Sequence, residues 1–442
     1  MISIPHGING KDKTRLHVTN HIPWPSIKGK KSRFFYGYII VLAAFLILMI
    51  VFGAELSFGV FLKPLLDEFG WTRTVISGAY SLKMALGGVF GIVAGRLCDR
   101  FGPRLVVTCC GFFVGLSYLL MSQISTIWQI YLFYGVFLSM GATCFLVPLV
   151  STVARWFVKR RGIANGIVMS GNGVGMVIMP TLANQLISNY SWRFSYVIIG
   201  LTVLVVTVIL AQFLRRDPRQ IGLEAYGADS VSSDSPDLGI QGFSFREAIR
   251  TRQLWTIYVM FICLGFCIHT VMVHIVAHAI DIGVSASAAA AILSMIGILN
   301  TGSKIGMGSI VDRIGNTRVI IIIFILMLVA FLWLPLASEL WMLYLFTVAF
   351  GIAFGGVGAV HSPTVAKFFG LRAHGAIYGL TASSICVGSA IGPLVAGRIF
   401  DIRGSYYWAF ILCTILIIVG LILSISLKFL KTAHLTRQSA LH

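Results

Sequence analysis

The stretch Gly95-Arg-Leu-Cys-Asp-Arg-Phe-Gly-Pro-Arg104 separates two long apolar segments and decides the fold. Part of it returns 213 residues later, where Gly95, Asp99, Arg100 and Gly102 are matched by Gly308, Asp312, Arg313 and Gly315. A second set keeps the same offset: Gly162, Gly166, Ser170, Gly175, Pro180 and Ala183 recur as Gly375, Gly379, Ser383, Gly388, Pro393 and Ala396. One offset that serves two distant sets predicts a duplicated chain.

The composition indicates that lipid is the main solvent of this chain. Of its 442 residues, 57% are hydrophobic and 11% are charged, whereas soluble domains carry about 25% charged residues. Apolar stretches long enough to cross a bilayer, about 20 residues each, predict an all-α membrane protein of twelve transmembrane helices in two pseudo-symmetric six-helix halves. We expect them at 36–62, 73–97, 104–122, 126–152, 161–188, 193–214, 253–281, 286–311, 317–337, 340–368, 373–400 and 405–430.

The net charge of +19 raises the alternative of nucleic-acid binding, which the distribution of Lys and Arg argues against. Most basic residues fall in segments on the side of the N-terminus. The opposite side carries Lys63, Arg73, Arg193, Arg398 and Arg403. This asymmetry predicts a multi-pass protein of the cell (inner) membrane with both termini cytoplasmic, surrounded by membrane lipid and without a nucleic-acid partner.

The expected domains follow from the spans. Residues 1–35 form a cytoplasmic tail, 36–214 the first half, 215–252 a cytoplasmic linker, 253–430 the second half and 431–442 a second tail. The linker carries a polar run that cannot bury a core. Its last part, 243–252, mixes Phe and Ile with Arg, as a helix lying on a membrane surface would.

The loop at 95–104 resembles the signature of the major facilitator superfamily, G-x-L-x-D-R-x-G-x-R, and the copy at 308–318 resembles it with one extra residue. The resemblance covers Tyr36 to Leu430 and implies the major facilitator fold. Physically, an Asp beside Arg at helix ends can hold neighbouring helices together until the protein rocks. We therefore expect a conformational latch made by Gly95, Asp99, Arg100, Gly102, Arg104, Asp312 and Arg313.

A narrower resemblance begins at Trp156 and ends at Gly166, in the sequence Trp-Phe-Val-Lys-Arg-Arg-Gly-Ile-Ala-Asn-Gly. It is similar to the fifth-helix signature of the monocarboxylate transporter and oxalate/formate antiporter branch. In that branch the position of Lys304 typically carries a substrate-binding Arg, and animal members have an Asp where Asn300 stands. The resemblance thus implies that Lys304 and Asn300 contact substrate, although Lys offers a point charge in place of a bidentate fork. Snorkelling of Lys304 towards the membrane surface is the alternative.

Glu55 and Lys83 are ionisable residues inside the first two spans, where an unpaired charge is costly. On adjacent antiparallel helices they can meet as an ion pair. One interpretation is a permanent structural pair. The other is that Glu55 accepts a coupling proton and releases Lys83 to a substrate anion.

Three further sets complete the candidates. His361, at a depth similar to that of Lys304, is a candidate for substrate or proton binding or a core histidine. Tyr118 is one of several aromatic residues that either line a cavity or pack. His274, His278 and Asp281 share a face near the outer end of the seventh span, where an outer gate is expected and a metal is not.

No enzyme motif and no cofactor are expected, since Gly171-Asn-Gly173-Val-Gly175 lacks a preceding strand and a Walker lysine. We predict a monomeric secondary transporter of a small organic anion, a monocarboxylate first, by proton symport or anion exchange. The alternatives are a transporter of a larger polycarboxylate or zwitterion, such as a citrate-type metal chelator, and a non-transporting sensor whose loop 215–252 binds a cytoplasmic partner.

Overall fold

The computed structural model describes residues 35–142, 144–157, 161–224, 226, 242–370 and 373–430; within these, the side chains of residues 91–96, 99, 147, 154, 161, 162, 305, 308, 309, 312, 374 and 428–430 are outside the description. The two expected tails lie outside it, apart from Phe35, as do residues 225 and 227–241 of the expected linker.

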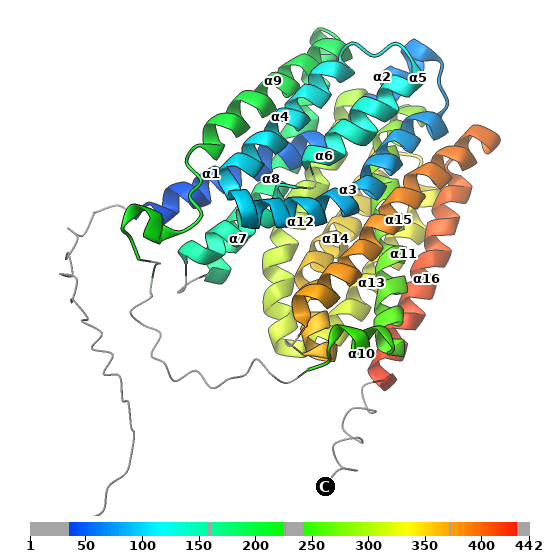
Figure 1. Ribbon diagram of the computed structural model, residues 1–442. Helices are drawn as coiled ribbons and strands as arrows, with labels where there is room; N and C mark the ends of the chain where they lie inside the picture. Colours follow the sequence, from blue (N-terminus) through cyan, green and yellow to red (C-terminus); the bar gives the residue numbers. More distant parts are fainter. Residues whose placement is uncertain are drawn as a thin grey trace, which may run out of the picture. The chain divides into compact units, whose positions relative to one another are not determined.

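The described chain is almost entirely helical (Figure 1). The elements of the first half are α1 Gly37–Leu56, α2 Phe58–Phe69, α3 Arg73–Phe101, α4 Pro103–Met121, α5 Ile127–Ile130, the π-helix η1 Tyr131–Phe137, α6 Leu138–Ala142, α7 Leu146–Trp156, α8 Arg161–Asn189 and α9 Trp192–Ala211. Those that follow are the 3₁₀ turn η2 Pro218–Ile221, α10 Phe245–Ile249, α11 Arg252–Asp281, α12 Ala286–Ile314, α13 Asn316–Trp333, the 3₁₀ turn η4 Leu334–Leu336, α14 Leu340–Phe369, α15 His374–Arg403 and α16 Tyr407–Leu430.

Ten spans in the described part of the chain are long and apolar enough to cross a membrane, with α1 and α2 counted together as Gly37–Phe69. The remaining two expected spans correspond to α3 and to the run from α5 to α7. The total of twelve therefore stays a prediction, whereas the all-α membrane fold is confirmed.

The expected single span at 126–152 is wrong in detail, because the helix divides into α5, η1, α6 and α7. Pro148 lies in the first turn of α7, where it has no N–H to donate and its ring would clash with the carbonyl of Cys144 in a continuous helix. The π-helix at Tyr131–Phe137 adds a second irregularity on the same run.

The 213-residue repeat appears in the backbone. Helices α3, α4, α5 and α8 begin at Arg73, Pro103, Ile127 and Arg161, and α12, α13, α14 and α15 begin 213 residues later at Ala286, Asn316, Leu340 and His374. The turns also match: Gly102 and Gly315 have φ of 83° and 85°, a left-handed region that side chains with a Cβ rarely adopt. The chain therefore contains two copies of one structural unit.

Glycine allows the same close contact in both copies. A Cβ on Gly175 of α8 would lie 2.0 Å from the Met49 carbonyl oxygen of α1, and one on Gly388 of α15 would lie 2.2 Å from the Ile262 carbonyl oxygen of α11. Each of these residues is 213 positions from its counterpart. Small residues permit such backbone approach where lipid supplies no hydrophobic drive for association.

The two copies contact each other through α3 against α15, α8 against α12, and α2 against α11. Figure 1 shows α3 lying along α15. The offset converts the α3–α15 pair into the α12–α8 pair, so the contact between the copies is itself pseudo-symmetric.

The described ends of the linker are attached to the helices. The Tyr226 N–H donates to the Trp156 carbonyl at 2.9 Å, and the Phe243 N–H donates to the Phe369 carbonyl at 2.9 Å. Within 243–252 the structure has the short helix α10, whose Ser244 and Glu247 form a capping box. Its position on a membrane surface stays a prediction.

The glycine contact generates a stability prediction with a control on the same helix. Gly175→Ala should lower the free energy of unfolding by about 1–3 kcal/mol, because the added methyl group overlaps the α1 backbone. Gly166→Ala should leave it unchanged or raise it by up to about 1 kcal/mol, since a Cβ there meets no described atom within 4 Å and Ala favours helix. Thermal unfolding of the purified protein in detergent measures both, and equal midpoints for the two variants would contradict the role of Gly175.

Candidate functional site

One end of the interface between the two copies is held by Arg73, the first residue of α3, and we call its contacts the Arg73 junction. The Arg73 guanidinium donates to Asp281 Oδ2 of α11 at 2.6 Å and to the Tyr406 hydroxyl at 2.5 Å. It also lies over the Phe400 ring of α15, 3.6 Å from the centroid. Only 5% of Arg73 is exposed, so the ion pair is poorly screened by solvent.

A second carboxylate completes the Arg73 junction. Asp401 of α15 accepts the backbone N–H groups of Arg73 at 3.0 Å and of Thr74 at 2.9 Å, as well as the Thr74 hydroxyl. These are free N–H groups of the first turn of α3, where the helix dipole also favours an anion. Lys63 of α2 approaches Asp281 at 3.7 Å. Four carboxylate oxygens of the second copy thus meet cationic or N–H groups of the first.

His274 and His278 belong to the same region. His274 contacts the Tyr406 hydroxyl through Nδ1 at 2.8 Å, and its Nε2 lies 2.9 Å from the Pro393 carbonyl and 3.2 Å from Ser77 Oγ. His278 packs edge-on against Tyr406 and Phe410. Among the side chains that the structure describes, no three His, Cys, Asp or Glu residues are arranged to hold a metal. These residues support the Arg73 junction.

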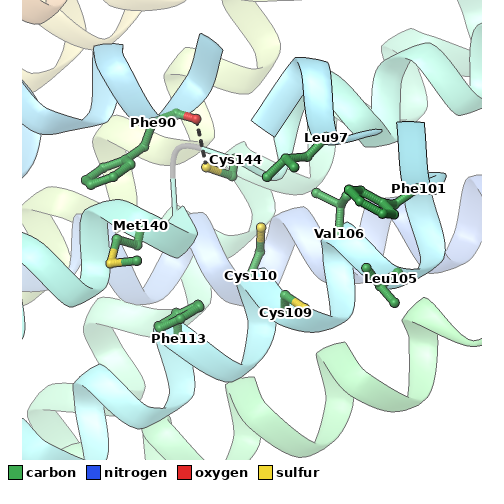
Figure 2. A pocket seen from close by; sticks show the side chains of 10 residues that line it. All are labelled: Phe90, Leu97, Phe101, Leu105, Val106, Cys109, Cys110, Phe113, Met140 and Cys144. Atoms are coloured by element: carbon green, nitrogen blue, oxygen red, sulfur yellow. Dashed lines mark hydrogen bonds between the residues drawn. The ribbon is translucent and has the colours of Figure 1, made fainter. Parts of the chain in front are cut away.

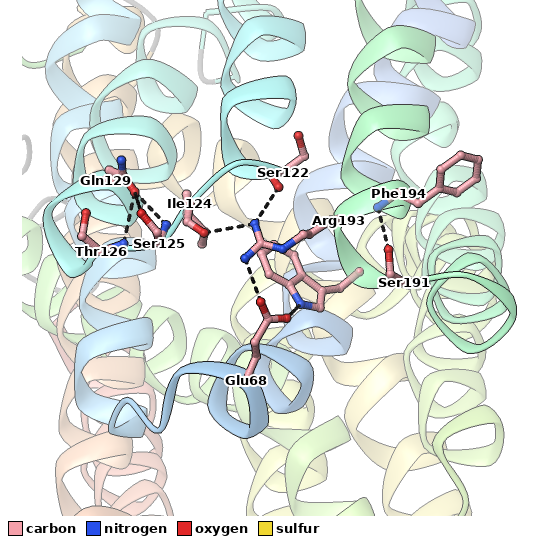
Figure 3. A network of polar contacts seen from close by, with 10 residues as sticks. Glu68, Ser122, Ile124, Ser125, Thr126, Gln129, Ser191, Arg193 and Phe194 are labelled. Carbon is pink, nitrogen blue, oxygen red and sulfur yellow. Dashed lines mark hydrogen bonds and ion pairs between the residues drawn. The ribbon is translucent and has the colours of Figure 1, made fainter.

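A comparison of the two copies explains why Arg73 of the first copy pairs with Asp281 of the second. Glu68 occupies the position of Asp281 in the first copy, and Arg193 occupies the position of Tyr406. Arg193 donates to Glu68 Oε1 at 2.7 Å and to the carbonyls of Ser122 and Ile124, all within the first copy, as Figure 3 shows. Because Tyr406 replaces the arginine in the second copy, Asp281 takes its arginine from the opposite copy.

Contacts between α8 and α12 continue from the Arg73 junction only part of the way along these helices. Thr301 of α12 touches α8 at Gly173, and Ser294 bonds Thr181 of α8 at 2.9 Å. Beyond this zone, a Cβ on Gly166 of α8 or on Gly302 or Gly306 of α12 would meet no described atom within 4 Å. Between α3 and α15 a groove of about 450 Å³ opens at Gly88 and Ser383. The interface is closed at the Arg73 end and open, among described residues, towards the other.

Lys83 of α3 and Glu55 of α1 meet as the sequence expected. The Lys83 ammonium donates to Glu55 Oε1, and 1% of Lys83 and 5% of Glu55 are exposed. The second carboxylate oxygen, Glu55 Oε2, is buried without a hydrogen-bond partner in the described structure. One turn before Lys83, the Tyr80 hydroxyl contacts His269 Nδ1 of α11 at 2.8 Å. The pair therefore lies one turn from a contact between the two copies.

Lys304 of α12 differs from Lys83 because no described residue gives it an anionic partner. Its stem passes Gly358 of α14, where a Cβ would lie 3.5 Å from Lys304 Cε. The ammonium makes no hydrogen bond or ion pair with any residue that the structure describes. One turn earlier, Asn300 is 2% exposed and its Nδ2 group lacks a partner within the same described set. Lys304 lies one helical turn after Thr301, towards the end of α12 where a Cβ on Gly302 or Gly306 would meet no described atom.

The other expected site residues have packed environments. His361 Nε2 lies 3.0 Å from Thr381 Oγ1, and the ring packs between Phe261 and Tyr378 within the second copy. Tyr118 stacks on Tyr196 in the first copy, and its buried hydroxyl has no partner in the described part of the chain.

The expected latch can be followed only in part. Gly95, Asp99 and Asp312 lie outside the residues whose side chains are described. Gly102 makes the α3–α4 turn, Arg100 and Arg313 are exposed, and Arg104 donates to Gln212 Oε1 at 2.7 Å. The latch therefore stays a prediction.

An apolar pocket of about 300 Å³ between α3, α4 and α6 offers a contrast (Figure 2). Phe90, Phe113 and Met140 line it, and Cys144 Sγ points to the Phe90 carbonyl at 3.4 Å. Its described lining residues include no cationic side chain, so they do not offer the chemistry of an anion site.

Sequence reasoning missed Asp401, Tyr406 and His269, and treated Arg73 only as a topology charge. The repeat held a usable signal for one of them, Tyr406. Aligning Glu68 with Asp281 and Arg193 with Tyr406 shows that one acidic residue has lost its local arginine.

The chain matches known transporters in sequence and in fold. Residues 40–315 and 281–441 match the Major Facilitator Superfamily. MFS-type transporter 1 of Ophiocordyceps sp. (strain BCC 1869) is 29% identical over 82% of this chain and 78% of its own length, and monocarboxylate transporter 4 of Rattus norvegicus is 27% identical over 85% and 80%. A bacterial homologue of the human lysosomal transporter Spinster has a similar fold, with a TM-score of 0.70, 18% identity and coverage of 91% of this chain and 97% of its own.

The Arg73 junction generates a prediction about conformation. Arg73→Gln should increase amide hydrogen exchange at both the start of α3 and the end of α15, because it removes the ion pair that joins the copies. Arg193→Gln removes an ion pair within one copy, so exchange should rise only around Glu68 and Arg193. If Arg73→Gln leaves exchange at the end of α15 at the wild-type level, the Arg73 junction does not hold the copies together.

Proposed function

The chain belongs to the Major Facilitator Superfamily, and from that premise we propose that it moves a small organic anion, first a monocarboxylate, by alternating access with protons or in exchange for another anion. The observation that carries the proposal is Lys304, an ammonium group inside α12 with no anionic partner among the described residues. Several relatives at 23–27% identity carry the name monocarboxylate transporter, which supports the same substrate class.

Lys304 and Asn300 supply the chemistry that a carboxylate needs. An ammonium and an amide N–H₂ one turn apart on α12 can each donate to a carboxylate oxygen. In a region of low dielectric such charge-assisted bonds are strong, and an anion would satisfy both groups at once. The site is reached from the open end of the interface.

The topology expected from the basic residues tells which end of the interface between the copies faces the outside of the cell. The Arg73 end is then the outer end, so the arrangement described above is closed outside and open to the cytoplasm. Opening to the outside requires Arg73 to leave Asp281 and Tyr406, while the α8–α12 and α3–α15 pairs close at their inner ends. Each copy moves as a block, because the Gly175 and Gly388 contacts lie within copies.

Glu55 and Lys83 are proposed to couple a proton to this motion. As an ion pair they neutralise each other, and removing one partner would leave a buried, uncompensated charge. Protonation of Glu55 cancels its charge and frees the Lys83 ammonium to attract the substrate anion. Release of the anion then restores the ion pair and expels the proton.

The substrate site predicts the outcome of a charge series at Lys304. Lys304→Met should reduce uptake of labelled lactate or acetate into proteoliposomes by about ten-fold or more, because a hydrogen bond to a charged group contributes about 1.5–3 kcal/mol. Lys304→Arg should keep measurable uptake, and Lys367→Met, at an exposed lysine, should behave as wild type. Unchanged uptake in Lys304→Met would show that Lys304 is not part of the substrate site. Inhibition of the uptake by citrate would indicate that the substrate is a polycarboxylate.

The coupling step predicts separate effects on two transport modes. Glu55→Gln should abolish the response of uptake to an imposed pH gradient while anion exchange between equal pH compartments continues, because the amide cannot carry the proton. Glu68→Gln, which changes an acid at the outer end of the same copy, should retain the pH response. Uptake by Glu55→Gln that still follows the gradient would assign the proton elsewhere or make the Glu55–Lys83 pair structural.

A further inference from the structure

Four arginines converge at the end of the first copy that is remote from Arg73. The turn between α3 and α4 and the segment after α9 enclose a pocket of about 230 Å³. Its side chains include Arg100, Arg104, Arg215 and Arg216, together with Gln220. We call it the four-arginine pocket. It belongs to neither the Arg73 junction nor the Lys304 site.

The positive charge of this pocket is not neutralised by the described residues around it. Among the residues whose side chains are described, which exclude Asp99, no acidic residue lines the pocket and none of the four arginines forms an ion pair. The polar partner of Arg104 is the neutral amide oxygen of Gln212. Asp217 is next to Arg216 in sequence, but its Oδ1 accepts a hydrogen bond from the Arg219 N–H at 3.0 Å. Asp217 thereby caps the start of η2.

We propose that the four-arginine pocket binds a phosphate group. Guanidinium groups pair bidentately with phosphate oxygens, and several of them can contact one tetrahedral phosphate from different sides, which a planar carboxylate does not allow. The first turn of α4, which begins at Pro103 beside the pocket, adds the positive end of a helix dipole. The pocket volume admits one phosphate with a small attached group.

Two sources supply such a group. The pocket lies where α3 and α9 end and α4 begins, a position at which basic pockets between membrane helices bind phospholipid head groups. A soluble phosphate ester carries the same chemistry. Both use the same arginines, so the experiment separates them by whether the phosphate is attached to a lipid.

The test measures ligand-induced stabilisation of the purified full-length protein, with glycerol 3-phosphate as the soluble probe and phosphatidylglycerol in mixed micelles as the lipid probe, against phosphatidylcholine. A ligand that binds the folded state raises the unfolding temperature as its concentration rises. The variants are Arg215→Gln/Arg216→Gln and the control Arg250→Gln/Arg252→Gln. The control pair lines a separate, open groove with Trp255 in the second copy.

At least one phosphate probe should stabilise the wild type. Its apparent Kd should weaken about ten-fold, equivalent to about 1.4 kcal/mol, in Arg215→Gln/Arg216→Gln, and by less than about two-fold in the control. Response to phosphatidylglycerol alone assigns a head group, and response to glycerol 3-phosphate assigns a soluble ester. No stabilisation by either probe, or equal losses in both double variants, overturns the proposal. The readout needs no transport, so it is independent of the proposed substrate.

Discussion

Close approach of helix backbones at glycine is the constraint on which this structure depends. Lipid solvates apolar side chains about as well as a protein interior does, so burial alone does not select helix partners in a membrane. Gly175 and Gly388 allow α8 to meet the Met49 carbonyl and α15 to meet the Ile262 carbonyl. These contacts join helices within a copy and make each copy a block. The copies meet where α8 contacts α12 and α3 contacts α15, and it is there that the proposed alternating access requires movement.

The contact between the two copies depends on one position at which their sequences differ. In the first copy, Glu68 finds Arg193 beside it, and that pair closes within the copy. In the second copy, tyrosine stands in the place of that arginine, and Asp281 pairs with Arg73 across the interface. A carboxylate that loses a local partner must find another, because a buried unpaired charge is costly. One difference between the two copies thereby replaces a contact within a copy by a contact between the copies.

Lys83 and Lys304 differ in whether a described carboxylate pairs with them. Lys83 is held by Glu55, so its charge becomes available only when that carboxylate is protonated. Lys304 has no such partner among the described residues and stands where the interface begins to open. The first is suited to coupling and the second to attracting an anion. Neither has a charged counterpart in the other copy, since residues 296 and 91 are Ile and Gly.

By itself, the sequence determined the membrane class, the duplication and the bounds of most helices, because apolar length and repeated glycines are local properties of the chain. It also indicated Glu55 with Lys83 as a pair, since adjacent antiparallel spans bring equal depths together. Only the tertiary structure decided that Pro148 interrupts a span where Cys144 and Phe90 meet, that Arg73 binds Asp281 and Tyr406, and that no acidic residue in the described part of the chain pairs with Lys304. The physical reason is that the partner of a charge depends on which helices of opposite copies meet, and that register is set by packing across the whole bundle.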